Sequence, residues 1–190
     1  NELLGQLIYF EMILGKGDIA SILNDRDRVI FFASGVSNSL CTDEKEFTRE
    51  FDLYREMFLK YGNYGHSLFY FSTLSVYTKD TPYTRHKLRM ENMIRMSYPN
   101  YCIIRIGNIT WGHNPNTFIN YFRNCIENDL PYQVRDEYKY LISEKELLTL
   151  TDNIPVTGKY ELSVTGRIVK VQDVVNELLN DKRKVYTDNL

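Results

Sequence analysis

The sequence predicts an α/β fold in which a parallel sheet is covered by helices on both faces. Apolar runs of strand length alternate along the chain with segments of helical period, a pattern typical of strands joined by crossover helices. The apolar runs are continuous, as expected for strands that are buried on both faces. The chain has 190 residues, 43% of them hydrophobic and 14% aromatic, which indicates one packed domain spanning residues 1–190.

Four segments are expected to form the strands of this sheet. In chain order they are Leu7–Leu14, Arg28–Ala33, Ser67–Ser72 and Tyr101–Ile106. Residues 7–106 are therefore predicted to form the core of the sheet.

Two helices are expected between these strands. The first, Asp43–Tyr61, carries an aromatic stripe at helical spacing, made of Phe47, Phe51, Tyr54, Phe58 and Tyr61. Thr42 is the expected N-cap of this helix. The second helix is predicted from about Tyr83 to Met96 and is ended by Pro99.

Residues 107–190 are predicted to form a small cap over the carboxyl edge of the sheet. A loop rich in glycine and asparagine leads into an expected helix at 116–127. Ser143 and Glu146 form a capping box at the start of another short helix. Ile168–Leu179 is predicted to be the end of a strand followed by a last helix.

Charge and cysteine content exclude several classes of protein. The 23 Lys and Arg residues against 25 Asp and Glu residues give a formal charge of -2, which argues against a nucleic-acid partner. Cys41, Cys102 and Cys125 are odd in number and lack metal-ligand spacing, so neither disulfides nor a metal site is expected. This cysteine content fits a reducing cytoplasm best, and no membrane span or secretory signal is visible.

A glycine-rich turn, Gly15-Lys16-Gly17-Asp18-Ile19-Ala20, follows the first predicted strand and is expected to open a helix. A G-x-G-x-x-A turn in this context lets the backbone approach a pyrophosphate. An ordinary strand-to-helix turn explains the same residues, and the Asp18 carboxylate would compete with phosphate for the turn's amides.

Three residues next to the third strand suggest acid–base chemistry. Tyr83 and Lys87 lie four positions apart on one helical face, so the ammonium is expected to lower the pKa of the phenol. A hydroxyl from Thr73, at the end of the preceding strand, could then hold a substrate oxygen. An isolated Y-x-x-x-K pair is also compatible with two neighbours on the surface of an amphipathic helix.

Taken together, these motifs resemble those of the extended short-chain dehydrogenase/reductase superfamily, in particular its sugar epimerase and dehydratase branch. The resembling segments are the Gly15–Gly17 turn, the strand 29–34, the strand end 72–77, the Tyr83/Lys87 pair and the segment 105–112. Alignment on Val76-Tyr77 puts Thr73, rather than Ser72 or Ser75, at the position of the catalytic serine or threonine. The resemblance runs from about Leu7 to Leu179.

The resemblance implies a Rossmann-like three-layer fold and hydride transfer with NAD or NADP. Tyr83 would move the proton, Lys87 would tune it and contact the nicotinamide ribose, and Thr73 would orient the reacting oxygen. The cofactor-binding residues implied are Gly15, Lys16, Gly17, Ala33, Ser34, Tyr83, Lys87 and Asn108. The substrate would be a hydroxyl or keto group of a sugar, commonly carried by a nucleotide. A homodimer through helices 43–61 and 83–96 is also implied.

The sequence departs from this family between Gly17 and the next strand. Only Asp18–Arg28 lie there, whereas a further strand, helix and strand would need roughly 30 residues or more. We therefore expect the usual second strand, its helix and the third strand to be missing, and with them the adenosine half of the cofactor site. Two hypotheses remain: a reduced epimerase, dehydratase or reductase, or a catalytically silent module that binds a nucleotide sugar or a partner protein.

Overall fold

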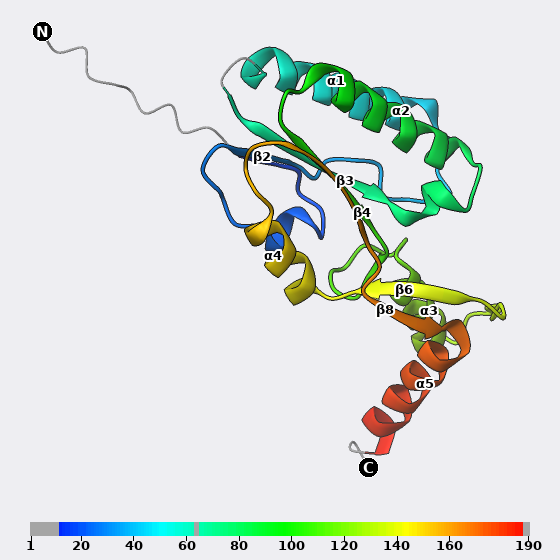
Figure 1. The fold of residues 1–190 in the computed structure, drawn as a ribbon. Coiled ribbons are helices and arrows are strands. Elements are labelled where there is room, and N and C mark those ends of the chain that lie inside the picture. Colours follow the sequence, from blue (N-terminus) through cyan, green and yellow to red (C-terminus); the bar gives the residue numbers. More distant parts are fainter. Residues whose placement is uncertain (1–11, 63–64, 188–190) are drawn as a thin grey trace, which may run out of the picture.

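The computed structural model describes residues 12–62 and 65–187, and its main feature is a parallel sheet of five strands (Figure 1). The strands follow the order β1-β2-β3-β4-β7. Their bounds are Ile13–Leu14 (β1), Val29–Phe32 (β2), Ser67–Thr73 (β3), Tyr101–Ile106 (β4) and Lys159–Val164 (β7). Every neighbouring pair is parallel, which confirms the predicted sheet.

Helices cover both faces of the sheet, so the predicted three-layer arrangement is confirmed. Helices α1 (Glu44–Tyr61) and α2 (Pro82–Ser97) lie together on one face (Figure 1). The 3-10 turn η1 (Ala20–Ile22) and helix α4 (Glu144–Asn153) pack on the other. Successive strand residues point to opposite faces: Phe32 and Tyr70 join the cluster under α1 and α2, whereas Phe31 and Phe69 join the second cluster.

The expected shortening between the first two strands is present. Strand β1 pairs directly with β2, with Ile13 opposite Phe31. Within the described residues, β1 is an edge strand of the sheet. The short helix predicted after Gly17 is present only as η1, a single 3-10 turn, whose few peptide dipoles give a weaker positive end than an α-helix would.

A second, three-stranded sheet carries the C-terminal part of the chain. It contains β5 (Asn108–Ile109), β6 (Tyr138–Ile142) and β8 (Arg167–Lys170), and it packs near helices α3 (Phe118–Glu127) and α5 (Val171–Thr187). The segment 107–190 was predicted to be a cap alone, but its strand β7 extends the main sheet beside β4. The alternating exposure of β7 hides it from a search for continuous apolar runs.

Local capping explains where the helices begin. Asp43, and not Thr42 as predicted, caps α1 by accepting a hydrogen bond from the Lys45 amide. Helix α2 starts with a Thr81–Thr84 capping box and a proline at its first turn. The predicted capping box at the start of α4 is confirmed.

The buried face of α1 differs from the predicted aromatic stripe. The buried positions are Phe47, Glu50, Tyr54, Met57 and Tyr61, whereas Phe51 is 44% exposed. Two buried positions therefore lie one residue earlier than predicted, Glu50 in place of Phe51 and Met57 in place of Phe58. This shift brings a carboxylate into the interface between α1 and the sheet.

Two further predictions concern the start of the chain and a membrane span. Of the predicted strand Leu7–Leu14, the part up to residue 11 lies outside the described residues. Among the residues that the structure describes, no helix combines the length and the hydrophobicity needed to cross a bilayer.

Candidate active site

Thr73, Tyr83 and Lys87 lie together at the carboxyl edge of the main sheet. Thr73 is the last residue of β3, and the turn η2 (Leu74–Tyr77) and the capped start of α2 bring Tyr83 back beside it. The Thr73 hydroxyl accepts from the Ser75 amide at 3.2 Å and lies close enough to the Tyr83 phenol to lower its pKa. The Lys87 Nζ lies 5.9 Å from the centre of the Tyr83 ring. The three residues singled out by the sequence are therefore neighbours.

Ser72 is placed differently from Thr73. It is buried and donates a hydrogen bond of 2.7 Å to Glu91 Oε1. Its hydroxyl is therefore committed to that carboxylate, in keeping with the choice of Thr73 as the residue that faces Tyr83.

Lys87 is almost completely buried, and its ammonium is bound within the protein. Its Nζ donates to Glu50 Oε1 and to the Tyr70 hydroxyl, each at 3.1 Å. Only 3% of the side chain is exposed. The ammonium therefore lies beneath the surface rather than in an open cleft, next to the phenol that it was predicted to tune.

Glu50 is the centre of this buried cluster, and no sequence motif pointed to it. Oε1 accepts from Tyr70 and Lys87, and Oε2 pairs with His86 Nε2 at 2.9 Å and accepts from the Val36 amide at 2.7 Å. Burial alone would raise the pKa of Glu50, but the Lys87 charge and these hydrogen bonds hold the pKa well below its usual range. We call Glu50, Tyr70, His86 and Lys87 the Glu50 cluster.

The net effect on Tyr83 is opposite to the prediction. Burial is the largest influence and raises the pKa of the phenol, while Lys87 lowers it. Glu50 raises it again, and the Thr73 hydroxyl lowers it. Because burial and Glu50 outweigh Lys87 and Thr73, the pKa of Tyr83 lies above its ordinary value, and the phenol is protonated at neutral pH.

The glycine turn packs directly against the end of β2. A Cβ on Gly15, whose φ is +144°, would lie 2.5 Å from the Ala33 carbonyl oxygen, so this position requires glycine. The Ala33 amide donates to the Leu14 carbonyl at 2.8 Å. Gly15, Ala33 and Ser34 are thus brought together as the resemblance implied. Gly17 is exposed, a Cβ added there would have no neighbour within 4 Å, and its carbonyl accepts from the Ser21 amide at 3.0 Å.

Asp18 binds a distant loop instead of the amides of its own turn. Its carboxylate accepts from the His113 and Asn114 amides, both at 3.0 Å, and its carbonyl accepts from Trp111 Nε1. The loop after β5 is therefore fastened to the glycine turn, and the predicted competition of Asp18 for the turn's amides is replaced by these contacts.

Gly35 closes the space above Lys87. A Cβ at this position would lie 2.5 Å from Lys87 Nζ and 2.8 Å from Glu50 Oε1. The loop Ser34–Val36, which continues from the predicted cofactor residues Ala33 and Ser34, therefore rests on the buried ion pair.

Asn108 lies in the small sheet, in β5. Its Nδ2 donates to the Tyr140 carbonyl at 3.2 Å. Lys16 is exposed. These two predicted cofactor residues are not joined by any described contact to Thr73, Tyr83 or Lys87.

A second buried group of charges is centred on Glu91, the carboxylate that accepts the Ser72 hydrogen bond. Glu91 pairs with Arg95 and Arg105, and both arginines also reach Glu161 of β7. Hydrogen bonding with Arg95 is the largest influence lowering the pKa of Glu161, to about 2. We call Glu91, Arg95, Arg105 and Glu161 the Glu91 cluster.

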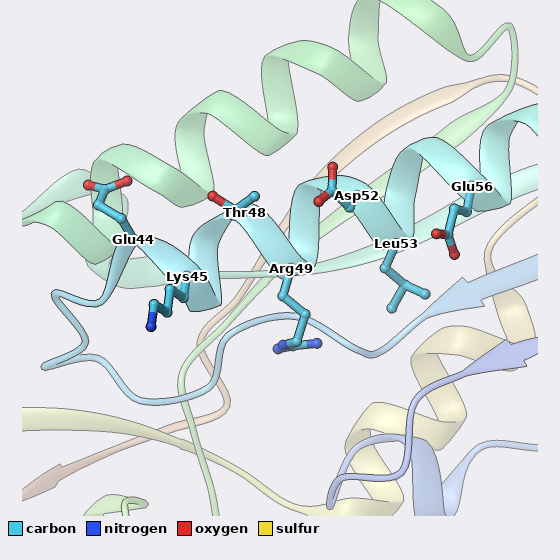
Figure 2. A pocket seen from close by; sticks show the side chains of 7 residues that line it. All are labelled: Glu44, Lys45, Thr48, Arg49, Asp52, Leu53 and Glu56. Atoms are coloured by element: carbon cyan, nitrogen blue, oxygen red, sulfur yellow. The ribbon is translucent and has the colours of Figure 1, made fainter.

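A broad groove in the described part of the surface follows the outer side of α1 (Figure 2) and does not include the Thr73–Tyr83–Lys87 site. Its lining residues are Glu44, Lys45, Thr48, Arg49, Asp52, Leu53 and Glu56. Among the described residues, no group of His, Cys, Asp and Glu has the arrangement of a metal site.

Comparison with known proteins supports the fold. No protein-family model and no curated protein sequence matches the chain. Among solved structures, the enzyme WbmG of Bordetella bronchiseptica in complex with NAD is similar, with a TM-score of 0.59 and 18% identity. The match covers 78% of this chain and 54% of that enzyme.

Two further solved structures show the same similarity. UDP-glucose 4-epimerase of Thermus thermophilus with NAD gives a TM-score of 0.56 at 15% identity, covering 77% of this chain and 58% of that one. The dTDP-4-dehydrorhamnose reductase of Bacillus anthracis with NADP gives 0.57 at 17% identity, covering 78% and 60%.

The chain thus shares the Rossmann-like fold of these structures, a parallel sheet between two layers of helices, as the sequence predicted. It spans little more than half the length of the solved structures that it matches.

Proposed function

We propose that the protein is an NAD(P)-dependent oxidoreductase of the short-chain dehydrogenase/reductase type, acting on a hydroxyl or keto group of a sugar or nucleotide sugar. The observation that carries this proposal is the meeting of Thr73, Tyr83 and Lys87 at the carboxyl edge of the parallel sheet. Ligands of open α/β sheets bind at this edge. The ligands bound in similar structures, NAD, NADP and UDP, support the same class of function.

The residues at the sheet edge fit part of a nicotinamide dinucleotide. Gly15 and the exposed Gly17, together with the Lys16 cation, suit the pyrophosphate. Ala33, Ser34, Tyr83, Lys87 and Asn108 are the residues proposed to surround the nicotinamide riboside. When bound, the dinucleotide supplies or accepts the hydride. Because β1 is an edge strand of the described sheet, the described residues provide no strand beyond it for the adenosine.

Two hydroxyl groups would carry out the acid–base chemistry. The Thr73 hydroxyl would hold the reacting oxygen of the substrate by a hydrogen bond. The Tyr83 hydroxyl would exchange its proton with that oxygen, since Thr73 lies close enough to the phenol to lower its pKa. Burial around Tyr83 limits the access of water to this proton transfer.

A catalytically silent module that binds a nucleotide sugar or a partner protein is the second candidate. The enclosed Lys87 favours it, because an ammonium bound to Glu50 and Tyr70 is not presented to a ribose. A homodimer through α1 and α2 is compatible with either function and is tested by light scattering.

Turnover separates the two candidates. The purified chain is mixed with NADH or NADPH and a panel of keto nucleotide sugars, and separately with NAD or NADP and a panel of hydroxyl nucleotide sugars, and nicotinamide absorbance is followed. We expect turnover with at least one substrate and its loss in Tyr83→Phe, with an unchanged circular dichroism spectrum. Binding of a nucleotide sugar without turnover in any combination would instead support the silent module.

A further inference from the structure

Glu50 occupies a position from which it controls both the location and the effective charge of Lys87. It comes from α1, whereas its partners come from β3 (Tyr70), α2 (His86 and Lys87) and the loop after β2 (Val36). The Glu50 side chain has no exposed surface. Four partners from three separate segments fix both carboxylate oxygens, so the charge of Glu50 is held close to Lys87.

We propose that Glu50 is a positioning residue of the Thr73–Tyr83–Lys87 site, holding Lys87 beneath the Ser34–Val36 loop and compensating its charge, so that Tyr83 is kept as a proton donor for carbonyl reduction. This inference rests on the proposed function. In this role Glu50 extends to higher pH the range over which Tyr83 can donate a proton to a carbonyl oxygen.

The physical basis is the pairing of opposite charges at short range. The Lys87 Nζ lies 3.1 Å from Glu50 Oε1, so at the distance of the Tyr83 hydroxyl the two charges partly cancel. An ammonium without this partner would stabilise a Tyr83 phenolate much more strongly. With Glu50 in place, Glu50 itself raises the pKa of Tyr83, and burial adds to this effect.

Other titratable groups near Tyr83 do not replace Glu50. Tyr70 is buried, and its pKa is raised well above its ordinary value, first by burial and then by Glu50. His86 pairs with Glu50 Oε2 and stacks on Phe47, while Cys41 packs at the edge of the small cluster that contains Tyr83. Glu50 is therefore the carboxylate that faces the Lys87–Tyr83 pair.

A protonated Tyr83 suits one direction of the chemistry. The carbonyl carbon of the substrate gains a hydride, which a reduced nicotinamide supplies. The carbonyl oxygen forms an O–H bond as the Tyr83 O–H bond breaks, and the resulting phenolate regains a proton from water. The reverse reaction requires Tyr83 to begin as a phenolate, a form that the Glu50 charge disfavours.

The test measures the ionisation of Tyr83 without any cofactor or substrate. Tyrosine labelled at Cζ is observed by NMR across a pH series in the wild type and in Glu50→Gln, and the Tyr83 signal is assigned with Tyr83→Phe. Glu91→Gln is the matched control. Glu91 is equally buried and also paired with cations, but its partners are Arg95 and Arg105 rather than Lys87.

We expect Tyr83 in Glu50→Gln to ionise at a pH lower by about one unit or more, a tenfold or larger change in its ionisation constant. The control should titrate like the wild type. An unchanged titration in Glu50→Gln, or an equal shift in Glu91→Gln, would overturn the proposal.

Glu50→Asp keeps the test decisive if Glu50→Gln does not fold. Aspartate retains the charge but is shorter, so Tyr83 should titrate within a few tenths of a unit of the wild type; a large downward shift would overturn the role of the charge. Because no dinucleotide is present, this outcome is independent of the turnover panel. Where turnover is found, Glu50→Gln should also move the alkaline limb of the kcat/KM profile for reduction to lower pH.

Discussion

Glu50 and Glu91 are both fully buried carboxylates paired with cations, yet the clusters around them differ in composition and surroundings. The Glu91 cluster pairs two carboxylates with two arginines and links α2, β4 and β7. The Glu50 cluster uses a lysine and a histidine, lies under the Ser34–Val36 loop and adjoins Tyr83. Similar burial and charge therefore link strands to α2 in one cluster and adjoin the phenol proposed to carry the proton in the other.

The largest expected effect is the loss of turnover in Tyr83→Phe. Removal of the hydroxyl should lower kcat by about 10²- to 10⁴-fold, because the proton donor is lost. The free energy of unfolding should change by only about 1 kcal/mol, the contribution of one hydrogen bond. Steady-state kinetics and urea unfolding measure the two quantities. A large loss of stability with intact turnover would contradict the catalytic role proposed for Tyr83.

The Glu91 cluster should show the opposite behaviour. Glu91→Ala removes the acceptor of Ser72, Arg95 and Arg105 and leaves cationic charge buried, which should cost about 3–5 kcal/mol of unfolding free energy. Urea unfolding checks this value. An unchanged unfolding free energy together with an altered ionisation of Tyr83 would contradict the structural role given to Glu91.

Acid should weaken both clusters. The pKa of Glu50 and that of Glu161 lie below the ordinary 4.5 in the folded chain, so each contributes stability above that pH. The contribution is lost as the pH falls below about 4.5 towards the folded pKa, which is about 2 for Glu161. The unfolding free energy should decline as the pH is lowered through this window, and Glu161→Gln should flatten the curve less than Glu50→Gln because Glu161 is partly exposed.

A smaller effect is expected from Gly35→Ala. The added methyl group would meet Lys87 Nζ and Glu50 Oε1 and should cost about 1–3 kcal/mol through displacement of the loop or the ion pair. Gly17→Ala is the matched control, because a Cβ at that position has no neighbour within 4 Å. Equal thermal stability of the two variants would show that the loop does not rest tightly on the Glu50 cluster.

Much of this arrangement follows from local sequence patterns. Continuous apolar runs predicted β2, β3 and β4, and the short interval after Gly17 predicted the direct pairing of β1 with β2. Strand β7 was missed because its residues alternate between partial burial and exposure at the edge of the sheet. Contacts between distant segments decide such a strand, and no local pattern reports them.

The residues of the site were predictable from the sequence, but the direction of the Tyr83 pKa shift was not. The Tyr83/Lys87 spacing and the strand end at Thr73 pointed to three residues that lie together in the fold. The direction of the Tyr83 pKa shift was wrong, because it depends on burial and on a carboxylate from another helix. One signal was available: Glu50 lies three residues after Phe47 and four before Tyr54, and a carboxylate on the buried face of a helix needs a cationic partner.

The most direct test of the central claim, that the sheet edge beside Tyr83 holds a nicotinamide, is a fluorescence titration of NADH and NADPH with the purified chain. We predict saturable binding, with a dissociation constant of about 1 mM or below, that is weakened in Lys16→Glu, a substitution at an exposed side chain. The absence of saturable binding of either dinucleotide at that concentration, by a chain whose fold is intact, would contradict the account.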